Sequence, residues 1–134
     1  MSKFGEGNFD ESNNWRVYIK NILEKYEYDY KVKVINPNDY FSFNDVFPKY
    51  KTQREIMEFD LNRVRNSNLI IVNFNDVYSL GTMAEIAIAY ENRIPIIGLN
   101  INKQDLHPWQ IEMCNRIFGD IGDMLDYTQN YYLN

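Results

Sequence analysis

Two short, uninterrupted apolar runs constrain the fold of this chain more than any other feature. Residues 69–72 (Leu-Ile-Ile-Val) and 95–99 (Pro-Ile-Ile-Gly-Leu) are rich in β-branched side chains. Runs of this kind are typical of strands that are buried on both faces of a parallel sheet. Between them Gly81 begins a helix, which covers residue 82 to about residue 92. A strand, a helix and a second strand in this order predict a parallel βαβ unit.

The sequence before this unit predicts a helix, a strand and a second helix. Apolar residues recur at helical spacing from Trp15 to Tyr26, with Asp10 or Ser12 as the expected cap. Residues 30–35 alternate in polarity and end at a turn, which predicts a strand. A polar and aromatic loop follows to about residue 50. Thr52 and Glu55 have the spacing of a capping box, so a helix is expected from there to about residue 66.

The remaining residues predict a short helix at residues 108–113, an edge strand at residues 116–118 and a closing amphipathic helix through residues 124–127. We therefore expect an α/β fold in which residues 1–134 form a single domain. Its core would be a flavodoxin-like or Rossmann-like parallel sheet of about five strands, with helices on both faces. Ligands of such folds bind beyond the carboxyl ends of the strands, so the loops after residues 35, 72 and 99 should line any site.

Composition excludes several classes of protein. The chain has 19 acidic and 14 basic residues, a net charge of −5, and no stripe of Lys and Arg, which argues against a nucleic-acid polymer as partner. Cys114 is the single cysteine, and no Cys/His cluster suggests a metal. Neither a signal peptide nor a membrane span is evident. The expectation is a cytoplasmic protein without cofactor or metal.

Asp60 is the first acidic residue in an unexpected position. On the helix from residue 52 it projects onto the side that carries Ile56, Met57, Leu61 and Val64, with Phe59 at the border. An unpaired buried charge is costly, so this carboxylate either finds donors or lines a cleft. A backbone amide, Arg16 or Arg63 could satisfy it structurally. A structural and a functional role are equally compatible with its position.

Glu85 is the second such acid. The helix around it is apolar on nearly every side, and Glu85 is its one charge before Glu91. We expect it in the first turn, after a central strand, where backbone amides and the helix dipole favour the ionised carboxylate. Acids in first turns are common for helix stability, but this apolar setting favours a function.

The segment before this helix offers possible ligand contacts. Ser79 and Thr82 carry hydroxyls, Gly81 permits a close backbone approach, and a helix amino terminus attracts anions. The same residues also make an ordinary capping sequence. Asp76 could join Asp60 and Glu85 around a pocket, or it could simply form a turn. His107 and Cys114 are interpreted as a loop residue and a small core residue, respectively.

Three segments in this order resemble the core of the nucleoside 2-deoxyribosyltransferase superfamily. They are residues 66–76 (NSNLIIVNFND), 79–89 (SLGTMAEIAIA) and 93–98 (RIPIIG). The family's usual pattern is a strand, an Asp, a Gly-Thr-x-x-Glu signature and a Lys/Arg-x-Pro strand. Residues 60–62 are similar to its helix acid, and residues 107–109 and 116–118 to its carboxyl-terminal part.

The resemblance implies that Glu85 is a nucleophile and that Asp60 and Asp76 hold or protonate the nucleobase. The carboxylate would attack the anomeric carbon and give a glycosyl-enzyme ester while an acid protonates the departing base. Ser79, Gly81 and Thr82 would contact substrate, as would Gly7 and Asn8. The last two lie where family members have a Tyr-Leu-Ala-Gly-Pro-like turn, but this chain has a Gly-rich, charged segment there, with Phe4 in place of an expected tyrosine.

Three functions remain open at this point. The first is transfer of 2-deoxyribose between nucleobases, and the second is hydrolysis of a deoxynucleoside 5'-monophosphate, because residues 79–81 are similar to a phosphate-holding loop. The third is nucleotide binding without turnover. The partner in each case is a small nucleoside or nucleotide. The 11 Tyr and 8 Phe also predict a homo-oligomer, a dimer or larger. The residues on which this rests are Tyr40, Phe41, Phe43, Tyr131 and Tyr132.

Overall fold

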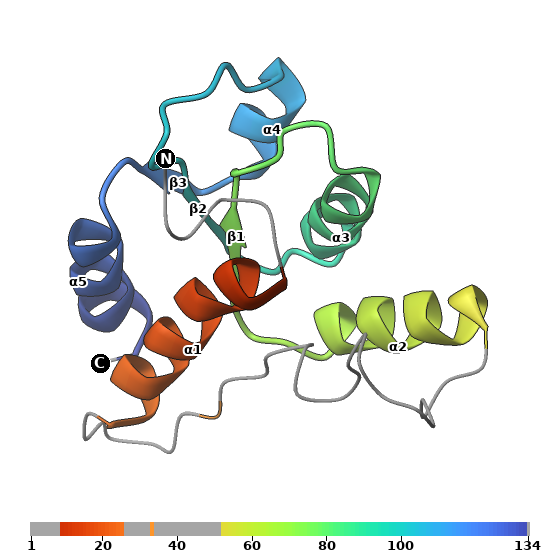
Figure 1. The fold of residues 1–134 in the computed structure, drawn as a ribbon, viewed down its shortest axis with the longest axis horizontal. Helices are drawn as coiled ribbons and strands as arrows, with labels where there is room; N and C mark the ends of the chain where they lie inside the picture. Colours follow the sequence, from red (N-terminus) through yellow and green to blue (C-terminus); the bar gives the residue numbers. More distant parts are fainter. Residues whose placement is uncertain (1–8, 26–32, 34–51, 134) are drawn as a thin grey trace.

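The computed structural model describes residues 9–25, 33 and 52–133. The elements follow in the order α1 (Phe9–Lys25), α2 (Gln53–Arg65), β1 (Ile70–Asn73), α3 (Leu80–Glu91), β2 (Ile96–Leu99), α4 (Pro108–Met113), β3 (Arg116–Phe118) and α5 (Ile121–Tyr132). The helices lie around the strands, with α3 and α5 on opposite sides of them (Figure 1).

The described strands form an open parallel sheet in the order β1-β2-β3. Ile70 pairs with Ile96, and Gly98 pairs with Ile117, so each strand is in register with the next. Helices α3 and α4 connect the successive strands. The predicted α/β fold with a parallel sheet is confirmed for these residues. The expected strand at residues 30–35 lies outside the described residues, so a sheet of about five strands stays a prediction.

Two apolar cores cover the two faces of the sheet. One joins α1 and α5 to the side chains of Ile97 and Leu99, and the other joins α2 and α3 to those of Val72 and Ile96. The alternation along β2 follows from the two-residue period of a strand, since successive side chains point to opposite faces. All four residues of β2 are buried, as the continuous apolar run predicts for a central strand.

Gly98 is required by packing in the second core. A Cβ atom at this position would lie 2.8 Å from a ring carbon of Phe74 and 3.1 Å from Cγ1 of Ile117. Both distances are shorter than normal van der Waals contacts. The glycine therefore lets the buried Phe74 ring lie directly against the strand.

Helix α1 contributes three buried apolar residues one turn apart, Trp15, Ile19 and Leu23, as the helical spacing predicts. The expected cap is wrong. The helix already includes Phe9, so Asp10 and Ser12 lie inside α1 and neither precedes it.

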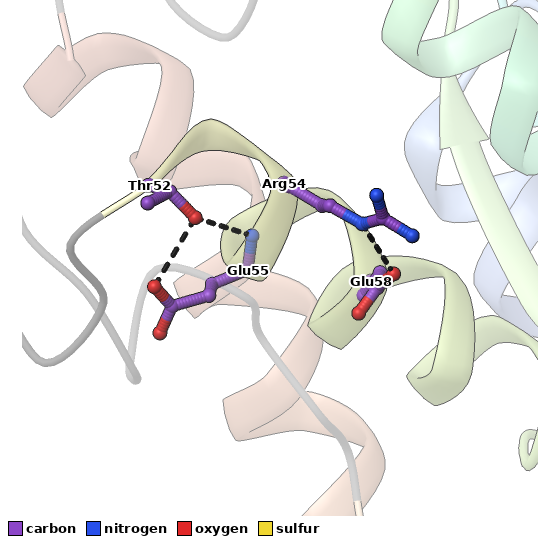
Figure 2. A network of polar contacts seen from close by, with 4 residues as sticks. All are labelled: Thr52, Arg54, Glu55 and Glu58. Atoms are coloured by element: carbon purple, nitrogen blue, oxygen red, sulfur yellow. Dashed lines mark hydrogen bonds and ion pairs between the residues drawn. The ribbon is translucent and has the colours of Figure 1, made fainter.

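Helix α2 begins as its sequence predicts. The Thr52 hydroxyl oxygen accepts a hydrogen bond from the backbone amide of Glu55 at 3.1 Å, and the hydroxyl donates to the Glu55 carboxylate at 3.1 Å (Figure 2). One turn on, Arg54 donates to Glu58 at 3.0 Å. This ion pair is exposed, so it contributes little to stability. The cap fixes where the helix starts and therefore which residues face inward.

The inward face of α2 is narrower than predicted. Val64 is buried and Ile56 is half-buried, but Met57 is 51% exposed. Residues four apart form one row on a helix, so Ile56, Asp60 and Val64 point in a similar direction. Met57 lies about 100° away from Ile56 around the helix, outside this row, and its side chain is therefore exposed.

The predicted bounds of α4 and β3 are confirmed, and the closing helix predicted through residues 124–127 is confirmed as the longer α5 (Ile121–Tyr132). Helix α4 covers Pro108–Met113 and β3 covers Arg116–Phe118 at the edge of the described sheet, while α5 buries Met124 and Leu125. Of the aromatic residues taken as signs of an oligomer, Tyr131 is 71% exposed and Tyr132 is half-buried. Residues 40–43 lie outside the described residues. Within the described ranges, no helix has both the length and the apolar character needed to cross a bilayer.

Candidate active site

The carboxyl ends of the parallel strands bring the loop after β1 beside the segment after β2. Backbone pairing continues past the strands, since the amide of Phe74 donates to the carbonyl of Leu99 at 2.8 Å and the amide of Asn100 donates to the carbonyl of Phe118 at 2.7 Å. The β1–α3 loop, residues 74–79, therefore starts from a fixed position. Parallel α/β folds bind ligands at this end of the sheet, beyond the carboxyl ends of the strands.

Glu85 lies on α3, but not in the environment that its sequence position predicts. Helix α3 begins at Leu80, and its first turn contains no acidic residue, so Glu85 lies in the second turn. The dipole and the free amides of a helix act mainly within the first turn. The expected stabilisation of the ionised carboxylate at the helix terminus is therefore wrong.

Burial controls the Glu85 carboxyl instead. Loss of solvent raises its pKa from an ordinary value of 4.5 to about 7, with a further increase from the charge of Asp60 and a partial decrease from the charge of Arg16. A carboxyl group with this pKa is close to half protonated at neutral pH. At neutral pH it can therefore both donate and accept a proton, whereas an ordinary surface glutamate is fully ionised and can only accept one.

Asp60 lies on α2 and is also partly withdrawn from solvent. Burial raises its pKa, and the charge of Arg16 lowers the pKa in part. Its Oδ1 atom is buried and has no hydrogen-bond partner among the described residues. A buried acceptor without a donor is destabilising and is rare in native proteins, which makes this oxygen a candidate for a functional role.

Arg16 on α1 is the cation of this group. Burial lowers the pKa of its guanidinium, while the charges of Glu85 and Asp60 raise it. The structure thus brings three residues from three helices into electrostatic contact, and we refer to Arg16, Asp60 and Glu85 as the charge cluster. The repulsion between the two acids raises the pKa of Glu85, the more deeply buried carboxyl group.

Asp76 takes the turn-forming role that was one of its two predicted alternatives. It is exposed, its Oδ1 accepts a hydrogen bond from the amide of Tyr78 at 3.0 Å, and its carbonyl accepts one from the amide of Ser79 at 3.3 Å. Neither Asp60 nor Glu85 has a pKa shift that is attributed to Asp76. In this structure Asp76 belongs to the β1–α3 loop and not to the charge cluster.

Ser79, Gly81 and Thr82 form the amino terminus of α3. Ser79 is the N-cap, and its Oγ accepts a hydrogen bond from the amide of Thr82 at 3.3 Å. A Cβ atom at Gly81 would meet no heavy atom within 4 Å, so packing within the described residues does not require a glycine there. An approaching ligand would have open space beside this helix terminus. Gly7 and Asn8 lie outside the described residues.

Two other residues of the sequence analysis have structural roles. The Nδ1 atom of His107 accepts a hydrogen bond from the amide of Trp109 at 3.1 Å, so the histidine caps α4. Burial raises the pKa of the Cys114 thiol to about 11, which keeps it protonated and unreactive at neutral pH.

A cavity of about 530 Å³ lies at the other end of the strands, next to the residues that precede β2 and β3. Its lining includes Arg93, Pro95, Glu112 and Asn115, and no predicted site residue. Asn115 is already engaged there, because its Oδ1 accepts a hydrogen bond from the amide of Ile96 at 2.9 Å. Across the described ranges, no three His, Cys, Asp or Glu side chains are arranged to hold a metal ion.

Gln104 and Gln110 bind the β1–α3 loop through their side chains, and neither was among the residues predicted from the sequence. A glutamine in a polar segment carries no pattern that separates such a role from solvent exposure. Arg16 was considered only as one possible partner of Asp60.

Comparison with known proteins adds no relative. No protein-family model matches the chain, and no curated protein matches it.

Proposed function

We propose that this chain is an N-glycosyl transferase of the nucleoside 2-deoxyribosyltransferase type. It cleaves the N-glycosidic bond of a 2'-deoxynucleoside, carries the sugar on Glu85 and transfers it to another nucleobase. The observation that supports this most is the charge cluster, in which two carboxyl groups with raised pKa values from neighbouring helices lie near one buried arginine. The Gly81-to-Glu85 signature adds sequence support.

In the reaction, Glu85 and Asp60 have complementary tasks. The ionised Glu85 carboxylate attacks C1' of the sugar, the C1'–N bond breaks, and its electron pair stays with the departing base. Asp60 supplies the proton that makes the base a neutral leaving group. A second base then attacks C1', gives up a proton to Asp60 and releases Glu85. The active form of the pair thus carries one proton, on Asp60.

The electrostatics of the charge cluster favour a pair with a single proton near neutral pH. That proton rests mainly on Glu85, whose pKa is about 7 while Asp60 is ionised, so the reactive form, with the proton on Asp60, is the minor one. Two close carboxylates repel each other when both are ionised, and burial strengthens the repulsion. Arg16 offsets part of it and favours the first ionisation. The pair shares its remaining proton, so the two carboxyl groups titrate together and not independently.

Hydrolysis of a deoxynucleoside 5'-monophosphate is the second candidate, and the open space at Gly81 favours it. A phosphate at the amino terminus of α3 could approach the backbone there without meeting a side chain of the described residues. In that reaction water takes the place of the second base, and Asp60 accepts the proton of the water.

One assay separates these functions. The chain is incubated with deoxyinosine or deoxyadenosine and a free acceptor base, and in parallel with a deoxynucleoside 5'-monophosphate, and the products are separated by chromatography. A new nucleoside supports transfer, whereas free base with deoxyribose phosphate supports hydrolysis. Unchanged substrate that nevertheless binds would replace both proposals by nucleotide binding without turnover.

A further inference from the structure

Two glutamine side chains tie the β1–α3 loop to the segment after β2. The Nε2 atom of Gln104 donates to the carbonyl of Asn75 at 2.7 Å, and the Nε2 atom of Gln110 donates to the carbonyl of Val77 at 3.1 Å. These two carbonyls stand on either side of Asp76. The loop is therefore held both before and after this acid, and we call the pair of contacts the glutamine clamp.

Each glutamine of the clamp is itself anchored. Gln110 is 2% exposed, and its Oε1 accepts a hydrogen bond from the amide of His107 at 2.7 Å, so both ends of its buried amide are bonded. Gln104 is fixed through its backbone, since its amide donates to Oδ1 of Asn100 and its carbonyl accepts from Nδ2 of Asn100, both at 3.0 Å. Asn100 directly follows β2, so the clamp connects the loop to the sheet.

The clamp reaches the amino terminus of α3 through consecutive hydrogen bonds. The carbonyl of Val77 is held by Gln110, the next amide, that of Tyr78, donates to Asp76, and the amide of Ser79 donates to the Asp76 carbonyl. Ser79 then caps α3. Loss of one clamp contact would leave a carbonyl without its donor and loosen the residues on which Asp76 and Ser79 depend.

We propose that Gln104 and Gln110 are positioning residues, which hold Asp76 and Ser79 in the arrangement that receives the nucleoside or nucleotide. This inference rests on the proposed function. The glutamines act through the loop and not by touching substrate. A loop fixed before binding loses less conformational entropy when the ligand arrives, so the clamp increases affinity.

The test uses substitutions that remove one donor and little else. Gln110→Glu keeps an acceptor oxygen for the amide of His107 but, when ionised, has no donor for the carbonyl of Val77. Gln104→Glu does the same for the carbonyl of Asn75. Gln53→Glu is the matched control, because Gln53 is exposed at the start of α2. Gln110→Met, which keeps length without charge, serves if the buried carboxylate prevents folding.

Two measurements are made on the full chain. Hydrogen exchange should increase on the order of fivefold to tenfold at the amides of Tyr78 and Ser79 in the clamp variants, while the amides of β2 stay protected. KM for the substrate should rise by a similar factor with a smaller change in kcat, and Gln53→Glu should match the wild type in both.

The outcomes distinguish this inference from the function on which it rests. An inactive wild-type chain overturns the proposed function, and with it the substrate role of the clamp. An active wild type with folded clamp variants that keep its KM and its exchange rates overturns the clamp alone. Faster exchange at the loop with an unchanged KM also overturns it, because the contacts would then be structural only.

Discussion

Burial and the charge of Asp60 on α2 together raise the pKa of the Glu85 carboxyl on α3 to about 7. The two acids are 25 positions apart in the sequence and on different helices. They nevertheless behave as one titrating pair with Arg16 as its counter-charge. The predictions below follow from this relationship and from the packing of the loop and sheet around it.

Replacing Asp60 with a neutral residue should lower the pKa of Glu85. In Asp60→Asn the repulsion between the two acids is gone, while burial and Arg16 remain, so the value should fall below about 7. Carbon-detected NMR titration of the Glu85 carboxyl measures this directly. The turnover rate should fall strongly as well, because the proton donor is missing. An unchanged titration would show that Asp60 and Glu85 are not coupled.

Glu85 should make the protein less stable at alkaline pH. Its folded-state pKa of about 7 is above the ordinary value of 4.5, so its contribution to stability is present in full below pH 4.5 and is lost as the pH rises to about 7. Glu85→Gln removes this dependence. The variant should be more stable than the wild type by roughly 3 kcal/mol at pH 8 and about equal at pH 4.

Denaturant unfolding of both proteins at the two pH values checks this prediction, and the difference between them removes the contribution of all other groups. The same variant should lose turnover while it keeps its fold. Equal stabilities at pH 8 would mean that Glu85 is better solvated than the structure has it.

Removing the positive charge at Arg16 should have the opposite effect to removing Asp60. Arg16 lowers the pKa of Glu85, so Arg16→Met should raise this pKa above about 7 and move the rise of kcat/KM to higher pH. Arg16→Lys keeps the charge and should show a smaller shift. Arg63→Met on α2 is the control for loss of a positive charge, because the charge of Arg16, and not that of Arg63, lowers the pKa values of Asp60 and Glu85. A profile that does not move in Arg16→Met would remove Arg16 from the cluster.

The two glycines of the site region should respond differently to alanine. Gly98→Ala places a methyl group against the Phe74 ring and should destabilise the protein by about 1–3 kcal/mol. Gly81→Ala meets no neighbour and lies in a helix, where alanine should stabilise by about 0.5–1 kcal/mol. Thermal or denaturant unfolding measures both. Unchanged stability in Gly98→Ala would contradict the packing described for Phe74, and a loss of stability in Gly81→Ala would contradict the open space beside Gly81.

Gly81→Ala also tests the hydrolase alternative. If a phosphate lies against the backbone at this helix terminus, the added methyl group should raise KM for a deoxynucleoside 5'-monophosphate more than KM for the corresponding nucleoside. Steady-state kinetics with the matched pair of substrates measures the difference. Equal changes in the two KM values would remove the phosphate from this position.

Period and polarity in the sequence were sufficient to predict most of the described fold. The continuous apolar run of β2 and the capping pair of Thr52 and Glu55 are local signals, and the structure confirms both. The same reasoning identified Asp60 and Glu85 as carboxyl groups among apolar residues. It worked because each acid interrupts an apolar pattern that its own helix otherwise keeps.

The pKa values and protonation of Asp60 and Glu85 could not be predicted from the sequence. Helix α3 begins at Leu80 and not at Gly81, which places Glu85 beyond the first turn, and the charges that act on it come from two other helices. Gln104 and Gln110 are similar cases, since their partners lie 29 and 33 residues away. Such contacts depend on the meeting of distant segments, and no local pattern encodes them.

A trapped covalent intermediate would show whether Glu85 carries the sugar during turnover. The chain is mixed with deoxyinosine without an acceptor base, quenched in acid within the first turnovers and digested, and the peptides are analysed by mass spectrometry. We expect one added deoxyribosyl group on the peptide that contains Glu85, located on that side chain by fragmentation and absent in Glu85→Gln. Turnover with no adduct on Glu85, together with full activity of Glu85→Gln, would contradict this role of Glu85.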